Sequence, residues 1–332
     1  MSELRSNTAL LLVTLLFVSG ISPLLLMTDA EPDEVSEVLP YNSRSVIIGD
    51  LDDFELEMGT QYLMFKEEQP IVSATLFMRQ AWIDAGRPGV EDMAYEPQTS
   101  ARAGGRACNA HVVNDQLSVD TTIGLVDTYV AKTTNTVAFL VQSGRTLSST
   151  VLNNLASSWD QTIYPTLTTY FGKDYQDGRG LAPPDNDNNC QVQIIIYDID
   201  GPYNIGGMFS PSSAGSGEAI YVDFADITLS WGKSIIAHEL QHLLHHALDP
   251  NEHVWINEGN ADVAIYLCFG SDSTLIGHLN SWTQSSELSV RWWNQRIADY
   301  GAGFMFAMYL ADHLGGGPAI RQWVQDSETG GL

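Results

Sequence analysis

The segment 234–247, SIIAHELQHLLHHA, constrains the fold of this chain more than any other part of the sequence. Its apolar residues recur with helical period, which predicts an amphipathic helix with one buried stripe. Pro250 is expected to end the helix soon afterwards, because proline cannot continue the hydrogen-bond ladder. His238 and His242 are four residues apart and therefore lie on one face, one turn from each other. Two imidazoles placed in this way can bind one tetrahedral zinc ion.

Glu239 completes an H-E-x-x-H pattern with the two histidines. It is one position away from the histidine face, so its carboxylate would flank the metal and could act as general base toward a water there. His245, one turn further on, is expected to line a cleft or lie at the surface. The alternative is a helix with incidental polar residues, although a chain of this composition would contain the pattern by chance only about 0.01 times.

A second apolar segment, residues 254–267, predicts the next helix, which should end near Gly270. Glu258 and Asp262 are four residues apart in it and share one face. A carboxylate on a buried helix is costly unless it is paired or binds a metal. We therefore expect Glu258 to be the third zinc ligand and Asp262 to accept an N–H from a zinc-binding histidine. A helix with an exposed acidic edge is the alternative.

The succession of H-E-x-x-H and N-E-x-x-x-D resembles the gluzincin metallopeptidases, the thermolysin-like branch, and more closely the hyicolysin family of secreted neutral metallopeptidases. The segments 158–172, 206–211, 219–223 and 300–310 share the likeness, which is strongest between residues 190 and 265. The spacing from His238 to Glu258 is shorter than in thermolysin-like enzymes. Leu248 stands where metzincins carry a third histidine, so a metzincin site is not expected.

The resemblance implies an α+β, zincin-like fold, with a mixed-sheet upper lobe that carries the active-site helix and a mainly helical lower lobe. It also implies an exported zinc-dependent endopeptidase that hydrolyses peptide bonds with a zinc-activated water, with Glu239 as the base. Tyr300 could stabilise the transition state or could be a structural residue at a helix start. Protein or peptide substrates could add to an edge strand of the sheet.

Other functions stay open at this stage. The principal alternative is a non-catalytic, zinc-stabilised extracellular surface or binding protein, in which Glu239 would be dispensable. A structural exported domain without metal is a further possibility. Within the peptidases, an exopeptidase is also possible, because no residues that would grip a substrate terminus can be identified.

The first thirty residues are expected to be a signal peptide. Arg5 precedes an apolar run at 9–18 that is broken by Gly20 and Pro23. An uncleaved membrane anchor is the alternative, and both predict a secreted or extracellular location. The net charge of −26 argues against nucleic acid and against an anionic membrane surface as partners. We expect a monomer.

The remaining sequence divides into three predicted parts: an acidic extension with a linker at 31–104, the upper lobe at 105–250 and the lower lobe at 251–332. The extension could contain short strands at 45–48 and 61–65 and a helical or mixed segment at 71–85. It could be an inhibitory prosegment, but an accessory strand layer is favoured.

Alternating or continuous apolar residues predict the strands of the upper lobe, and helical period predicts a long helix interrupted near Pro165. The predicted strands are 117–122, 123–132, 136–142, 192–196 and 218–224, and the helix is 146–171.

Three cysteines occur in the chain. Cys108 and Cys190 could pair in an oxidising compartment, whereas Cys268 is expected to be a buried thiol. The run 185–189, DNDNN, begins like a calcium loop, but the sixth position is Cys190 instead of glycine and the twelfth is Ile196 instead of glutamate. A polar turn is therefore favoured, and Ca²⁺ is the weaker alternative.

Overall fold

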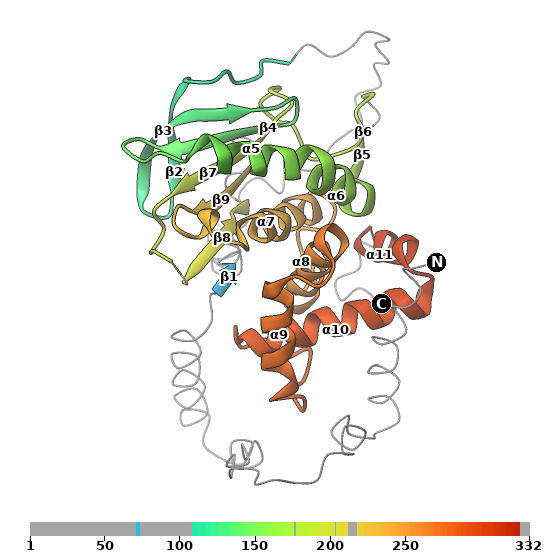
Figure 1. Ribbon diagram of the computed structural model, residues 1–332. Coiled ribbons are helices and arrows are strands. Elements are labelled where there is room, and N and C mark those ends of the chain that lie inside the picture. Colours follow the sequence, from blue (N-terminus) through green and yellow to red (C-terminus); the bar gives the residue numbers. More distant parts are fainter. Residues whose placement is uncertain (1–70, 74–107, 176, 203, 212–217, 326–332) are drawn as a thin grey trace.

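The structure is a computed structural model that describes residues 71–73, 108–175, 177–202, 204–211 and 218–325. It is a mixed α+β arrangement in which helices pack against a seven-stranded sheet (Figure 1). The predicted signal peptide and most of the acidic extension lie outside the described residues. Among those described, none of the helices combines the length and apolar character needed to cross a bilayer.

The sheet is built around three parallel strands, β4 (Val137–Gln142), β7 (Val192–Tyr197) and β9 (Ala219–Asp223). These strands are almost entirely buried, which explains their continuous apolar sequence. An antiparallel pair, β2 (Gln116–Thr121) and β3 (Gly124–Thr133), extends the sheet beside β4. The predicted strands in this region are confirmed to within a few residues.

On the other side of β9 lie two short strands. β8 (Ile205–Phe209) is antiparallel to β9, and β1 (Ile71–Ser73) is parallel to β8. The segment 71–85 was expected to be helical or mixed; residues 71–73 form a strand and not a helix, and the rest of the segment lies outside the described residues. A separate two-stranded sheet joins β5 (Lys173–Tyr175) to β6 (Gly180–Ala182).

The connection from β4 to β7 is a helical crossover. It consists of α5 (Ser149–Ser158), a π-helical segment (Trp159–Ile163) and α6 (Tyr164–Phe171). The predicted interruption is therefore a change in winding just before Pro165, not a break. The wider π-helical turn suits this place, because proline has no N–H to continue the regular ladder.

A short 3-10 turn (Asp226–Thr228) leads into α7 (Gly232–His246), and α8 (Val254–Phe269) follows. Both helices agree closely with the prediction. The remaining helices of the described part are α9 (Ser273–Thr283), α10 (Ile297–Leu314) and α11 (Gly317–Val324). Helix α7 packs against β8 and β9 on one side and α8 on another, and α8 packs against α10.

One hydrophobic core runs from the sheet to the last helix and includes Phe139, Leu240, Phe304 and Val324. The predicted upper and lower lobes therefore pack on a common core. A disulfide joins Cys108 to Cys190 beside the sheet. Cys268 is a free thiol on α8, and burial raises its pKa to about 12.

Candidate metal centre

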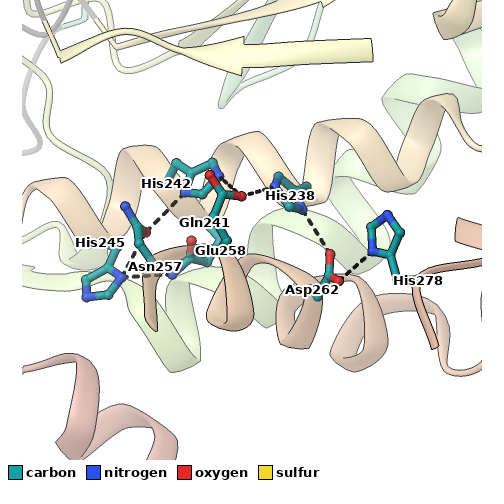
Figure 2. A network of polar contacts seen from close by, with 8 residues as sticks. All are labelled: His238, Gln241, His242, His245, Asn257, Glu258, Asp262 and His278. Atoms are coloured by element: carbon teal, nitrogen blue, oxygen red, sulfur yellow. Dashed lines mark hydrogen bonds and ion pairs between the residues drawn. The ribbon is translucent and has the colours of Figure 1, made fainter. Parts of the chain in front are cut away.

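Helices α7 and α8 lie against each other and bring three predicted zinc ligands to one point (Figure 2). The Nε2 atom of His238 is 3.1 Å from Oε2 of Glu258, and the Nε2 atom of His242 is 3.3 Å from the same oxygen. Possible ligand atoms of all three residues lie within 4.8 Å of one another. Each of these residues is at most 1% exposed.

These distances fit a tetrahedral zinc site. With metal–ligand bonds of about 2.0–2.1 Å, two ligands of a tetrahedron are about 3.3 Å apart. The two measured nitrogen–oxygen separations are close to that value. Two imidazoles and one carboxylate are also a donor set that zinc accepts at sites where a fourth position stays open. The residues present therefore fit zinc both in geometry and in chemistry.

The other ring nitrogen of each histidine faces an acceptor. The Nδ1 atom of His238 is 3.3 Å from Oδ1 of Asp262, and Nδ1 of His242 is 3.1 Å from Oδ1 of Asn257. An acceptor at Nδ1 favours the tautomer that leaves Nε2 free to bind a metal. Asp262 therefore lies at ion-pair distance from His238 without a hydrogen bond to it, and its predicted role stays a prediction. The structure adds Asn257, to which the sequence analysis gave no role.

His278 extends this arrangement to a third helix. Its Nδ1 atom lies 2.6 Å from Oδ2 of Asp262, so Asp262 stands between two histidines from α7 and α9 (Figure 2). His278 was not predicted. Its only sequence signal was its place in an apolar helix, and the approach of α9 to α8 depends on tertiary packing.

Burial and the contacts between histidines and carboxylates together set the pKa values of His238, Glu258 and Asp262. Burial alone would lower the pKa of His238, but contacts with Asp262 and Glu258, and the charge of Glu239, raise it to about 10. Burial would raise the pKa of Glu258, but His242 and His238 lower it to about 2. Asp262 likewise has a pKa of about 2, because His278 and His238 outweigh its burial. The acidic neighbours therefore favour the cationic form of His238 at neutral pH.

Glu239 is fully buried on α7, on the side that packs against β8. The strand comes so close that a Cβ atom on Gly207 would lie 3.0 Å from Cγ of Glu239. A glycine at this position of β8 therefore leaves room for the side chain of Glu239. The side chain of Glu239 thus lies between α7 and β8, close enough to His238 for its charge to raise the pKa of that ring.

His245 differs from its prediction. It is buried, and its Nδ1 atom lies 3.1 Å from Oδ1 of Asn257 and 3.1 Å from Nε2 of Gln241. A surface position is therefore wrong. His245 shares Asn257 with His242 and so belongs to the polar network around the ligands (Figure 2).

Tyr300 lies near the ligands at the start of α10. Its ring centre is 6.1 Å from that of His238 and 5.0 Å from that of His278. The ring is buried and also contacts Trp293, with ring centres 4.9 Å apart. These ring contacts are consistent with either of its two predicted roles.

Comparison with protein-family models gives no match, and comparison with curated proteins finds no relative of this chain. The likeness to the hyicolysin family therefore stays a prediction that depends on the sequence motifs. The convergence of His238, His242 and Glu258 from α7 and α8 is an observation on this chain itself and does not depend on the likeness.

Proposed function

We propose that this chain is an exported, zinc-dependent endopeptidase with a zincin-like fold, and that His238, His242 and Glu258 hold the metal. The observation that carries the proposal is the convergence of these three side chains from two helices, with Glu239 beside them. The order of strand, crossover helix, strands and active-site helix supports the zincin-like part. The disulfide supports export, since such bonds persist in oxidising compartments.

In this proposal, each residue near the ligands has a stated task. Zinc, when bound, would supply a Lewis acid that polarises the scissile carbonyl and lowers the pKa of a water. Glu239 accepts a proton from the attacking water and later delivers it to the leaving amine nitrogen. Asn257 accepts the Nδ1 proton of His242, and the carboxylate of Asp262 attracts Nδ1 of His238 from 3.3 Å, so that both rings are held in orientation. Tyr300 is the candidate donor to the developing oxyanion.

A non-catalytic, zinc-stabilised binding protein is the second candidate. The near-complete burial of the three ligands favours it, because structural zinc sites are closed to solvent. The two candidates differ in what they require of Glu239. A structural site needs no carboxylate beside the ligands, whereas hydrolysis needs a base there.

The test is casein hydrolysis by the wild type and by Glu239→Gln. We expect the wild type to lose activity with a chelator and to regain it with added zinc. Glu239→Gln should bind zinc with unchanged stoichiometry and should lose at least about 100-fold in kcat/KM, the typical contribution of a positioned acid–base group. Glu287→Gln, at an exposed glutamate, is the matched control and should keep full activity.

Two outcomes would contradict the proposal. If Glu239→Gln cleaves casein like the wild type, Glu239 is not the base. If zinc binds but neither protein shows hydrolysis, the structural candidate replaces the peptidase.

A further inference from the structure

A second group of acidic side chains lies away from α7 and α8, where the chain enters strands β7 and β9. Asp185 and Asp187 are in the loop before β7, and Glu218 directly precedes β9. The two strands are parallel neighbours, so the segments that lead into them meet at one edge of the sheet. Carboxylate oxygens of the three residues lie within 4.8 Å of one another.

Glu218 is the residue that points to a ligand. Its side chain is 1% exposed, and one oxygen, Oε1, accepts the backbone N–H of Asn186. The other oxygen, Oε2, is buried and has no hydrogen-bond partner within the described part of the chain. An unpaired carboxylate in such a place is costly, because it loses its hydration without compensation.

The surroundings of Glu218 increase that cost. Burial, with smaller contributions from the charges of Asp187 and Asp185, raises the pKa of Glu218 to about 8. Among the residues that the structure describes, neither Glu218 nor Asp187 forms an ion pair with a lysine or arginine. Without a bound cation, Glu218 is therefore mostly protonated at neutral pH, because no lysine or arginine among the described residues pairs with it.

The loop holds two of the carboxylates in fixed positions. The Oδ1 and Oδ2 atoms of Asp187 accept hydrogen bonds from the backbone N–H and the side-chain amide of Asn189, at 3.0 and 2.8 Å. The Oδ1 atom of Asp185 accepts the N–H of Cys190 at 3.2 Å. Cys190 is bonded to Cys108, which ties the loop to a distant part of the chain. A site built in this way loses little conformational entropy when it binds a ligand.

We propose that Asp185, Asp187 and Glu218 bind one hard divalent cation, Ca²⁺ being the preferred ion. Three carboxylates without nitrogen or sulfur donors suit calcium, magnesium or manganese better than zinc. Ca²⁺ tolerates irregular geometry and accepts further oxygens from backbone and water, which suits a loop beside a sheet edge. The proposal is independent of the peptidase function, since the two groups share no residue.

For residues 185–189 the proposal favours the calcium alternative over the polar turn. In the sequence, Cys190 and Ile196 stand at the sixth and twelfth positions, where a calcium loop would carry glycine and glutamate. The third carboxylate comes instead from Glu218, which the pairing of β7 with β9 brings to the loop.

Calcium titration of the metal-stripped full chain, with its disulfide intact, tests the proposal. Calorimetry should show one site in the wild type, and the thermal midpoint should rise by about 5 °C at a calcium concentration of about 100 Kd. Glu218→Gln keeps the acceptor for Asn186 but loses the charge, and it should bind calcium at least about tenfold more weakly. Asp174→Asn, at an exposed carboxylate on β5, is the matched control and should respond like the wild type.

Asp187→Asn is the second variant and should also bind calcium at least about tenfold more weakly. It keeps the test decisive if Glu218→Gln does not fold. Magnesium is titrated in parallel, and a response to either ion that both variants remove supports the site. The proposal is overturned if the wild type responds to neither ion at millimolar concentration. It is also overturned if both variants respond like the wild type, since the ion then binds elsewhere on this acidic chain.

Discussion

Folding strongly changes the ionisation of His238. Its pKa of about 10 is above the value of 6.5 for an unfolded histidine, so its proton stabilises the zinc-free fold fully below pH 6.5. This contribution is lost as the pH rises through about 10. We expect the zinc-free protein to lose on the order of 4 kcal/mol of unfolding free energy between pH 6.5 and 10, measured by urea denaturation.

The control for this prediction is His238→Gln, which lacks the titrating ring. Glu218, with a raised pKa of about 8, also makes the protein less stable as the pH rises. This contribution is present in both proteins and cancels when the unfolding free energy of the variant is subtracted from that of the wild type. At the acid end, Glu258 has a depressed pKa, so its contribution is lost as the pH falls from 4.5 through about 2. Equal alkaline slopes for wild type and His238→Gln would contradict the assignment of the proton to His238.

At the residue scale, the sequence was informative where helical spacing decides the geometry. His238 and His242 had to share one face because they are one turn apart, and the same holds for Glu258 and Asp262. Helical spacing could not reveal His278, whose contact with Asp262 depends on how α9 packs.

At the scale of elements, the contact between α8 and α10 supports the metal centre. A Cβ atom on Gly259 would lie 2.7 Å from the carbonyl oxygen of Gly303, so the two helices touch through their backbones next to Glu258. We expect Gly259→Ala to push α8 away from α10 and to cost about 2 kcal/mol of stability. The gain of about 1 kcal/mol in helix propensity only partly offsets this cost. Urea denaturation and zinc titration measure the two effects.

Gly303→Ala provides a graded comparison. Its Cβ atom would lie 3.0 Å from the carbonyl oxygen of Trp255, a milder contact, so its loss of stability should be smaller. Zinc affinity should fall more in Gly259→Ala, because Glu258 is the neighbouring residue. If Gly259→Ala stabilises the protein, helix propensity dominates and the close packing is not essential.

The elements that the sequence predicted well are those with a strong apolar signal. Helix α7 carries a periodic apolar stripe, α8 is apolar on most of its faces, and the observed bounds of both lie close to the predicted ones. Strand β8 was not among the predicted strands, because Gly206 and Gly207 weaken its pattern. Gly207 is required by the approach of Ile235 and Glu239, and this is a property of packing. Local pattern therefore could not identify this strand.

At the scale of the whole molecule, the sheet edge beside α7 is the place where an extended peptide substrate was expected to pair. In the structure, β1 pairs with β8 at that edge, with Ile71 opposite Ile205 and Ser73 opposite Gly207. Helix α7 packs beside both strands. Backbone groups of β8 that pair with β1 are not free for a substrate, because a strand edge offers one set of hydrogen bonds.

The pairing of β1 with β8 suggests an experiment that distinguishes the two predictions for the acidic extension, an inhibitory prosegment and an accessory strand layer. The change is a cleavage site for an added protease, introduced after residue 104. If β1 blocks the edge of β8, cleavage at this site should raise casein hydrolysis by at least about tenfold. A tenfold rise corresponds to the loss of about 1.4 kcal/mol of β1–β8 pairing that competes with the substrate. The same protein sample is assayed before and after cleavage, so a difference in folding between two preparations cannot cause the change. The Glu239→Gln variant, cleaved in the same way, controls for contaminating peptidase. Unchanged activity after release of the segment would show that β1 is an accessory strand and that substrates bind elsewhere.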